Sequence, residues 1–374
     1  MRVLSLDDDG LSLPSGARWA LVYSSVEAPF SSALQKLAAA APAAEIFGST
    51  SFRGVLLPTG FRRGVFALIG EACDPRAVQA VRASSAGRAR ADARAACAEI
   101  RERLGKRPDV FLLHATPGFE ERILDGVSDA FDDEPPPLYG GSAADDDLSG
   151  KWRVLSGTQA IAEGFVLVGF ASDNQVHGSF VAGYMPTERR GRVTAASGRR
   201  VATIDGRTAA RVYNEWLEGT LSDVVQSGGN VLARTTLHPL GRMIDKVGQV
   251  PRYLLSHPHQ LHEDGTLSFF TDIAVGEELS LMLGSEAALL DRTDQVAARA
   301  GRGAGALRGG ILIYCAGCVG MIGHKTSLVA ERFSQRIQQA PFIGASTYGE
   351  QGCFFGTSAK NRHGNLMCDA ILFE

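Results

Sequence analysis

The chain of 374 residues contains an internal repeat, and this repeat limits the possible folds more than any other feature of the sequence. Residues 110–114 and 311–315 are apolar runs of strand length, and each is followed by a turn that begins with alanine and contains glycine. The next stretch is helical in pattern, with apolar residues at positions i, i+4 and i+8. These are Ile123, Val127 and Phe131 in the first copy, and Val329, Phe333 and Ile337 in the second. Self-similarity of this kind predicts two structurally related halves.

Each copy continues with a second strand, residues 137–142 and 341–346, which begins with proline. A strand, a crossover that contains a helix, and another strand form a βαβ unit with parallel strands and a right-handed connection. A last strand closes each half, at residues 165–170 and 370–373. We therefore expect an α/β protein of two related halves. Each half should be a mixed sheet with flanking helices and a βαβ unit, with a ligand cleft at the carboxyl ends of the strands.

The regions outside the repeat predict the division into domains. Residues 75–107 are rich in Ala and Arg and predict a long helix, and residues 186–198 are polar, Arg-rich and glycine-containing, as is typical of a linker. We therefore place an N-terminal domain at residues 1–198 and a C-terminal domain at residues 199–374.

The overall composition excludes several classes of protein. The sequence has 38 basic and 41 acidic side chains, which argues against a nucleic-acid-binding surface. It has no uninterrupted apolar run long enough to span a bilayer, and its first residues do not have the pattern of a secretion signal. Six sparsely placed cysteines are typical of a reducing compartment. We expect a cytoplasmic protein whose partners are neither nucleic acid nor membrane.

The glycine-rich loops after the second strands are candidate ligand sites. Parallel strands end at one edge of a sheet, so His114 should lie near residues 140–147, and residues 315–318 near 344–353. Gly140, Gly141 and Ser142 would let the backbone approach a ligand, and the three aspartates that follow could hold an amino group or a metal. A tight strand-exit turn with a solvated acidic end is the alternative.

Cys315 and Cys318 have the spacing of a redox or metal-binding pair. The sequence has no second pair of this spacing, so a four-cysteine zinc site is not indicated. Cys315 ends a strand and is expected to be buried in packing, whereas Cys318 should lie near Cys353 if the loops converge. That would allow a reactive thiol, and the alternative is a pair of inert thiols. A thiol-dependent enzyme with Cys318 or Cys353 as nucleophile, a nearby His as base and Glu350 as the orienting group is the second functional hypothesis, and a pure interaction scaffold is the third.

A cluster of three histidines lies in the segment 257–263. Its spacing matches no compact metal motif. We expect a hairpin of residues 253–256 and 266–271, with Asp264 and Gly265 at its turn and the histidines exposed on its surface.

Several of these segments resemble one protein family. Residues 139–147 are similar to the signature of the N-terminal half of FIST proteins, which are named for F-box and intracellular signal transduction. The C-terminal half also has the family's motifs in order: Asp264 and Gly265; Met282, Leu283 and Gly284; Cys315, Ala316 and Gly317; Glu331; Tyr348, Gly349 and Glu350; and His363, Gly364 and Asn365. The resemblance covers roughly residues 20–374. Two departures are Cys318, where many relatives have Arg, and Gly364, which separates a His and an Asn that are adjacent in relatives.

The resemblance implies a sensory role in bacterial signal transduction. FIST proteins are thought to bind small ligands, with amino acids suggested, and to signal to histidine kinases or cyclic-dinucleotide enzymes, here through a separate partner. A stand-alone subgroup binds haem and senses nitric oxide, which would make His363, His324 and His114 candidate axial ligands. Together with the loop argument, this predicts the following ligand-binding residues: Gly140, Gly141, Ser142, Asp145, Asp146, Cys315, Gly317, Cys318, Gly344, Ser346, Tyr348, Gly349, Glu350 and Asn365.

Overall fold

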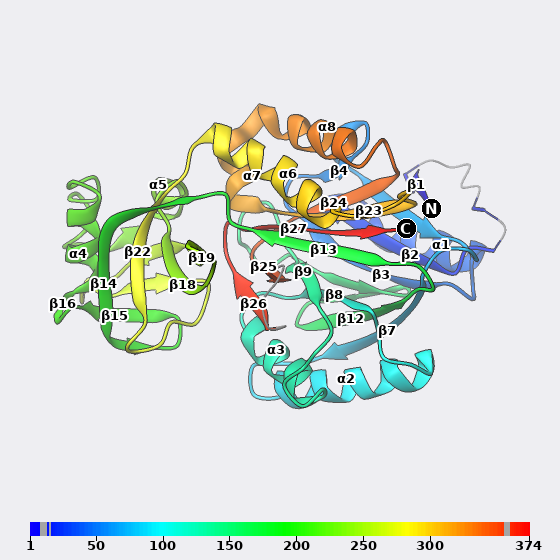
Figure 1. Ribbon diagram of the computed structural model, residues 1–374, viewed down its shortest axis with the longest axis horizontal. Coiled ribbons are helices and arrows are strands. Elements are labelled where there is room, and N and C mark those ends of the chain that lie inside the picture. The colour runs from blue at the N-terminus through cyan, green and yellow to red at the C-terminus, as the bar shows by residue number, and fades with distance from the viewer. Residues whose placement is uncertain (8–12, 15, 355–359) are drawn as a thin grey trace.

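The structure is a computed structural model that describes residues 1–7, 13–14, 16–354 and 360–374. It has two parts (Figure 1), which we call the body and the lobe. The lobe is formed by residues 185–283 around one antiparallel sheet, and the body contains three mixed sheets and both ends of the chain. Helices account for 23% and strands for 40% of the structure, so the predicted α/β class is confirmed.

The three sheets of the body each have six strands and one parallel pair. Sheet 1 is ordered β1 (Arg2–Ser5), β6 (Val65–Gly70), β2 (Trp19–Ser25), β3 (Glu45–Ser51), β10 (Val154–Ser156) and β11 (Gln159–Ile161). Sheet 2 is ordered β26 (Asn361–Gly364), β25 (Glu350–Cys353), β9 (Leu138–Ser142), β8 (Val110–Ala115), β12 (Gly164–Ala171) and β7 (Arg76–Ala83). Sheet 3 is ordered β13 (Val176–Val181), β27 (Cys368–Phe373), β23 (Gly309–Cys315), β24 (Phe342–Thr347), β4 (Val55–Leu57) and β5 (Gly60–Arg62).

Helices cover the outer faces of these sheets. In Figure 1, α6 and α8 lie over sheet 3, and α2 and α3 lie on the opposite side of the body, under sheet 2. The helices of the body are α1 (Phe30–Ala40), α2 (Ala89–Leu104), α3 (Glu120–Asp129), α6 (Glu286–Ala300), α7 (Ala316–Ile322) and α8 (Thr326–Arg336), with a 3-10 turn at Gly323–Lys325. None of the helices among the described residues is long and apolar enough to cross a membrane.

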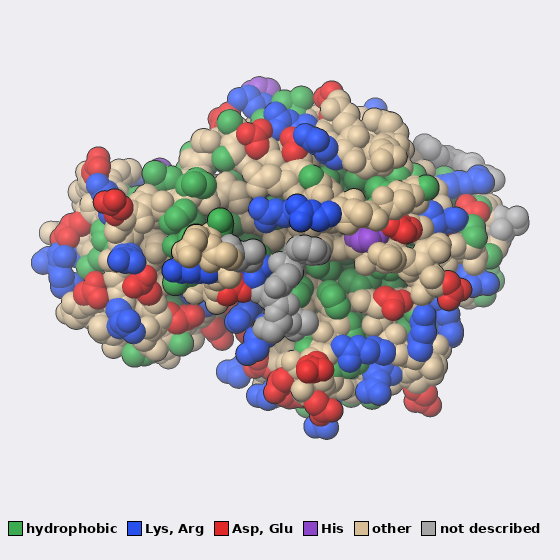
Figure 2. Space-filling model, in the orientation of Figure 1, with side chains coloured by type: hydrophobic (Ala, Val, Ile, Leu, Met, Phe, Trp, Pro, Cys, Tyr) green, Lys and Arg blue, Asp and Glu red, His purple; other side chains and the backbone are tan. Residues whose placement is uncertain are grey.

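The lobe is built on an antiparallel sheet of nine strands. Its main path is β17 (Gly229–Asn230), β20 (Pro258–Leu261), β21 (Leu267–Phe269), β15 (Arg200–Ile204), β14 (Met185–Ser197), β22 (Glu278–Leu283), β18 (Leu240–Val247) and β19 (Val250–Ser256), with β16 (Arg207–Thr208) paired to β15. Two short helices, α4 (Ala209–Trp216) and α5 (Leu232–Thr235), belong to the lobe. On the face in Figure 2, acidic and basic side chains are mixed over lobe and body.

The predicted βαβ units are present, and the body has a third copy of the same unit. The pairs β8–β9 and β23–β24 are parallel, as predicted, and so is β2–β3. In each unit the first strand is flanked on its other side by an antiparallel strand: β12, β27 and β6 respectively. The second strand of each unit has a glycine opposite the middle of the first strand, so Gly48, Gly140 and Gly344 are equivalent positions.

This glycine is required because the two strands approach too closely for a side chain. A Cβ at Gly48 would lie 1.8 Å from the carbonyl oxygen of Val22, and one at Gly140 would lie 2.0 Å from that of Leu113. Both glycines also have positive φ, +155° and +148°, which other residues rarely adopt. At Gly344 φ is not positive, and a Cβ would lie 2.8 Å from the carbonyl oxygen of Leu312, so close strand approach is the reason that the three copies share.

The sheets join residues from both halves of the chain. Strand β25 pairs with β9, with Glu350 opposite Gly141, and β13 pairs along the length of β27. One apolar core contacts all three sheets, because Phe170 of sheet 2 lies 5.5 Å from Trp19 of sheet 1 and 5.1 Å from Phe373 of sheet 3, measured between ring centroids. The two halves therefore fold around a common interior.

Three expectations about local structure were wrong. Residues 75–107 form the strand β7 before the helix α2, because β7 pairs along its whole length with β12 and this pairing outweighs the helical tendency of its alanines. The predicted linker is the strand β14, whose outward-facing polar residues resemble those of a loop. The turn at Asp264 and Gly265 is present, but β20 rather than residues 253–256 pairs with β21.

The domain division after residue 198 falls in the β14–β15 turn and stays a prediction.

Candidate functional site

A cavity of about 460 Å³ lies between the body and the lobe, and we call it the interface cavity. From the body it is lined by Phe52, Arg53, Asp146, Asp147, Leu148, Cys315, Ala316, Gly317, Gly320, Met321, Thr347, Tyr348 and Asn365. From the lobe it is lined by Asn230, Leu232, Ala233, Thr236, His257 and Phe270. The wall is mainly apolar with a few polar groups, which is typical of a site for a small organic ligand.

Tyr348 connects the loops that follow β9 and β24. Its hydroxyl donates to the backbone carbonyl and to Oδ1 of Asp145, and its backbone N–H donates to the carbonyl of Ser142 at 3.1 Å. Burial and the nearby Asp145 raise the pKa of Tyr348, so the phenol stays protonated. The ring also contacts Trp152 edge-on, with the centroids 6.0 Å apart. Tyr348 therefore holds the two glycine-rich loops together.

The aspartates after β9 have different roles. Asp145 is fully buried and accepts hydrogen bonds from the backbone N–H groups of Leu148 and Lys151, both at 2.7 Å, so it closes its own loop. Asp146 lines the cavity and accepts from the backbone N–H of Arg53 at 2.7 Å. Only Asp146 of the two predicted aspartates is therefore placed to contact a ligand.

His257 forms part of the cavity wall on the lobe side. It is 3% exposed, and its Nε2 lies 3.1 Å from the carbonyl oxygen of Leu232, so this nitrogen carries the proton. Burial lowers the pKa of His257 to about 3, which keeps the ring neutral. The expectation that the histidine cluster is exposed was wrong for this residue. Residues 250–256 pair with β18, so the chain enters the junction with the body at His257.

Asn365 lies in the cavity wall with an unused hydrogen-bond donor. Its Oδ1 accepts from the backbone N–H of His257 at 3.1 Å, which links body to lobe. Its Nδ2 is buried and has no hydrogen-bond partner among the described residues. A buried donor left unpaired costs about 1–3 kcal/mol.

Cys315 and Cys318 lie at the start of α7. Cys315 lines the cavity, whereas Cys318 is fully buried behind it with its sulfur 3.7 Å from the hydroxyl of Tyr184. Burial opposes the thiolate of Cys318, but the hydrogen bond from Cys315, the charge of Arg292 and the hydrogen bond from Tyr184 lower its pKa to about 6. The pKa of Cys315 is raised, chiefly by burial. The pair therefore holds one thiol and one thiolate near neutral pH.

Glu350 lies beside this pair but does not line the cavity. It is fully buried, its Oε1 accepts from the hydroxyl of Thr347 at 2.8 Å, and its Oε2 accepts from the backbone N–H of Met367 at 2.9 Å. Burial raises the pKa of Glu350 to about 8 in spite of these bonds. Glu350 is therefore mostly protonated at neutral pH.

A second polar cluster surrounds Glu120. Ser142 donates to its Oε1 and Arg199 to its Oε2, both at 2.7 Å, and His363 lies 3.9 Å from Oε1. Burial opposes ionisation, but the charges of His363 and Arg199 and these hydrogen bonds lower the pKa of Glu120 to about 2. The side chains of Glu120, Glu121 and His363 are close enough to hold a metal ion. Arg199 donates to both carboxylates, so a guanidinium already supplies the positive charge there.

The predicted ligand-binding residues divide into two groups. Those that line the interface cavity are Asp146, Cys315, Gly317, Tyr348 and Asn365. Those that do not are Gly140, Gly141, Ser142, Asp145, Cys318, Gly344, Ser346, Gly349 and Glu350. Most residues of the second group are buried in strands or at strand ends just behind the wall. Gly349 is an example: a Cβ at this position would lie 2.5 Å from Cε1 of His363, so the glycine leaves room for that ring. They can shape the cavity but do not face it.

The three candidate haem ligands do not fit a haem in this cavity. His114 is fully buried, and its ring nitrogens bond to the carbonyl of Gly141 at 3.1 Å and to the hydroxyl of Tyr23 at 3.0 Å. His363 is bonded to Gln351 at 3.0 Å, and His324 is exposed in the turn before α8. None of the three lines the cavity, so the residues present do not support axial ligation there.

The closeness expected of Cys318 and Cys353 stays a prediction, and the thiol bonded to Cys318 is that of Cys315. Cys353 lies in β25 with its sulfur 3.9 Å from the carbonyl of Phe354, while the thiol next to Cys318 is Cys315. Full burial of Cys318 also separates it from the cavity. The arrangement therefore gives no support to a nucleophile with Glu350 as its orienting group.

Sequence reasoning missed the lobe side of the cavity. Asn230, Leu232 and Thr236 come from a segment with no recognisable motif, and Phe270 follows a short strand. The one usable signal was the histidine cluster, because His257 begins it. Burial of that histidine depends on how the lobe sits on the body, which a local pattern does not report.

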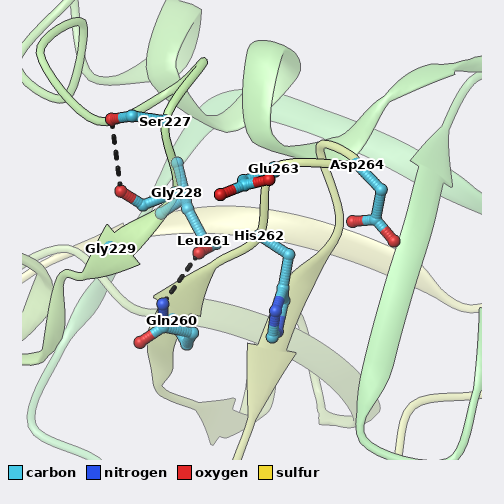
Figure 3. A pocket seen from close by; sticks show the side chains of 8 residues that line it. All are labelled: Ser227, Gly228, Gly229, Gln260, Leu261, His262, Glu263 and Asp264. Carbon is cyan, nitrogen blue, oxygen red and sulfur yellow. Dashed lines mark hydrogen bonds between the residues drawn. The ribbon is translucent and has the colours of Figure 1, made fainter.

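A second hollow, of about 590 Å³, lies in the lobe and is more open to solvent (Figure 3). Ser227, Gly228 and Gly229 face residues 260–264 across it. Two of the side chains drawn there bond within their own segments, Ser227 to the carbonyl of Gly228 at 3.4 Å and Gln260 to the carbonyl of Leu261 at 2.9 Å. This hollow has no unpaired buried donor among the described residues, so the interface cavity is the stronger candidate.

Comparison with known proteins identifies the family. A family model described as the FIST N domain matches residues 18–207, and one described as the FIST C domain matches residues 209–353. A comparison with curated proteins found no match. FIST domains are in general sensory and signal-transduction domains that bind small ligands. The two matches cover nearly the whole chain, and the protein therefore belongs to the FIST family.

Proposed function

We propose that this protein is a sensor that binds a small, amino-acid-like metabolite in the interface cavity and signals by changing how the lobe sits on the body. The observation that carries the proposal is the shared wall, because a ligand held between the two parts makes contacts that depend on their relative position. A ligand shifts a conformational equilibrium only through such differential contacts.

The chemistry of the wall supports a ligand of this class. The unpaired Nδ2 of Asn365 can donate to a carboxylate or carbonyl oxygen, and the carboxylates of Asp146 and Asp147 can accept from an ammonium group. Leu232 and Met321 offer apolar surface to a side chain. A volume of about 460 Å³ suits a small metabolite.

The proposed output goes to a separate protein, such as a histidine kinase or a cyclic-dinucleotide enzyme. Arg199 of the lobe bonds to Glu120 of the body, and Asn365 of the body bonds to the backbone of His257 in the lobe. These bonds lie at the junction, so a change in the junction alters the surface that both parts present to a partner.

The test is a screen for ligands by thermal shift, using the amino acids and their simple derivatives, with the affinity of any hit measured by calorimetry. A ligand at 100 times its Kd should stabilise the protein by about 2.7 kcal/mol. Trp152, which contacts Tyr348, should report binding by a change in fluorescence. The variant Asn365→Ala should bind more weakly, and Asn174→Ala, on an exposed loop of the body, should bind normally.

Two results would contradict the proposal. In one, hits bind Asn365→Ala as tightly as the unchanged protein, which would place the ligand elsewhere. In the other, the purified protein holds haem with an absorption band that shifts on reduction and on addition of nitric oxide. Haem sensing would then replace metabolite sensing as the function.

A further inference from the structure

We infer that Cys315 and Cys318 form a redox-active pair that a hydroperoxide entering the interface cavity oxidises to a disulfide. The inference does not depend on the proposed function, because it concerns the chemistry of the cavity wall with no metabolite bound. Three observations carry it: the geometry of the pair, the access to one of its sulfurs, and a buried cation with unpaired donors behind the other.

The geometry of the pair permits a disulfide. Cys315 is the last residue of β23 and the N-cap of α7, and Cys318 lies in the first turn of that helix. Residues three apart in a helix have Cα atoms roughly 5 Å apart, which falls in the range of about 4.4–6.8 Å found in disulfides. The thiol of Cys315 donates a hydrogen bond to Cys318, so the two sulfurs already face each other.

Access to the pair is one-sided. Cys315 lines the interface cavity, where a molecule as small as hydrogen peroxide can reach it, and Cys318 is completely buried behind it. Gly317 lies between the two cysteines and has no side chain. A Cβ at Gly317 would lie 3.6 Å from the sulfur of Cys315, so the glycine leaves that side of the sulfur uncovered. Cys315 is therefore the sulfur that meets the oxidant, and Cys318 is the one that resolves the intermediate.

Arg292 provides the charge that favours a thiolate in this pair. It is fully buried in α6, stacks on the ring of Tyr314 with its guanidinium carbon 4.1 Å from the centroid, and donates from Nη1 to the carbonyl of Leu366 at 2.6 Å. Its Nε and Nη2 have no hydrogen-bond partner among the described residues. Cys318 contributes the largest favourable charge interaction to Arg292, so the thiolate is its counter-ion.

The reaction balances with hydrogen peroxide as the oxidant. Cys315 passes its proton to Cys318 and attacks the peroxide, which breaks the O–O bond and gives a sulfenic acid on Cys315 and a hydroxide ion. This hydroxide takes the proton from Cys318 and leaves as water. The thiolate of Cys318 then attacks the sulfur of the sulfenic acid, forms the disulfide and displaces hydroxide, which takes a proton from solvent. In sum, one thiol and one thiolate lose two electrons, and the peroxide takes these electrons and one proton from solvent to give two molecules of water.

Oxidation should also weaken the protein. The disulfide removes the thiolate, and Arg292 then loses the counter-ion of its buried charge. A disulfide that closes so short a loop constrains the unfolded chain only slightly. We therefore expect the oxidised protein to melt at a lower temperature than the reduced protein, and dithiothreitol to restore the original melting temperature.

The experiment treats the full chain with hydrogen peroxide, blocks the remaining thiols with iodoacetamide, and maps the cysteines by mass spectrometry. Trypsin releases residues 309–325 as one peptide that contains both cysteines of the pair. The expected result is a peptide that has lost two hydrogen atoms and carries no alkyl group. Cys73→Ser, which removes an exposed thiol, should behave the same, and Cys318→Ser should stop at an oxyacid on Cys315.

Other outcomes would overturn the inference. One is that Cys73 is oxidised while the peptide 309–325 keeps both thiols. Another is a disulfide from Cys318 to Cys353 or Cys368. A disulfide at the expected place supports the inference whatever the melting temperature, and an unchanged or raised melting temperature would overturn only the claim that Arg292 depends on the Cys318 thiolate. Both overturning outcomes can be read from the unchanged protein, so they do not require any variant to fold.

Discussion

Arg199 donates to Glu120 across the junction between lobe and body, with 2.7 Å between Nη2 and Oε2. Arg199 lies in the turn between β14 and β15, and Glu120 is the first residue of α3. The same nitrogen reaches Glu121 at 2.7 Å. Since Glu120 is only 1% exposed, its charge depends on partners inside the protein, and one of them comes from the lobe.

Removal of this partner should destabilise the protein. In Arg199→Met, Glu120 would be left as a buried carboxylate without its guanidinium, and breaking a buried ion pair in this way costs about 3–5 kcal/mol. Urea unfolding at pH 7 measures the change. The matched control is Arg200→Met, whose side chain is exposed and bonds to Asp264 and Thr266, and which should change stability by less than about 0.5 kcal/mol. Equal effects of the two substitutions would mean that the junction does not depend on Arg199.

Glu350 should make the protein less stable as the pH rises. Its pKa is about 8 in the folded protein against an ordinary value of 4.5, so its protonated form favours folding below pH 4.5 and this contribution is lost between pH 4.5 and 8. At 1.36 kcal/mol for each pKa unit, the whole contribution is on the order of 5 kcal/mol. Glu350→Gln stays neutral and should not show it.

The measurement compares urea unfolding at pH 5 and pH 8 for the unchanged protein and for Glu350→Gln. The thiolate of Cys318 acts in the opposite direction, because its pKa is lowered to about 6, and the variant retains it. The difference between the two proteins therefore isolates Glu350. Glu102→Gln, at an exposed position of α2, is the control and should keep the pH dependence of the unchanged protein. A parallel pH dependence in Glu350→Gln would show that Glu350 is ionised in the fold.

The sequence was informative where structure follows from local periodicity. The βαβ units, the meeting of His114 with Gly141 and that of Cys315 with Thr347 could be predicted, because parallel strands place their carboxyl ends at one edge. The lobe side of the cavity could not, because burial of His257 depends on contacts between segments far apart in the chain. The glycine-rich loops were interpreted as ligand-binding loops. At Gly140, however, the glycine allows β9 to pack closely against β8, and the residue does not line the interface cavity.

The third βαβ unit leads to a prediction about Gly48. Its equivalence to Gly140 means that alanine should be equally damaging at both positions, since each Cβ would overlap a carbonyl oxygen of the neighbouring strand. We expect Gly48→Ala and Gly140→Ala to cost more than about 4 kcal/mol each, or to prevent folding. Thermal unfolding followed by circular dichroism measures this. Gly87→Ala, where a Cβ meets nothing within 4 Å, should be nearly neutral. A stable Gly48→Ala protein would disprove the equivalence of the first unit.

Gly320 offers a way to block the interface cavity without harming the fold. It lies in α7, lines the cavity, and has nothing within 4 Å of a would-be Cβ. Replacement of a helical glycine by alanine should stabilise the protein by up to about 1 kcal/mol, and leucine should do nearly the same. The two variants differ in reach, because only leucine extends into the cavity. Gly320→Leu should therefore lose the thermal shift caused by a ligand, while Gly320→Ala keeps it. If both respond to ligand alike, the ligand does not bind in this cavity, whatever the stability of the two variants.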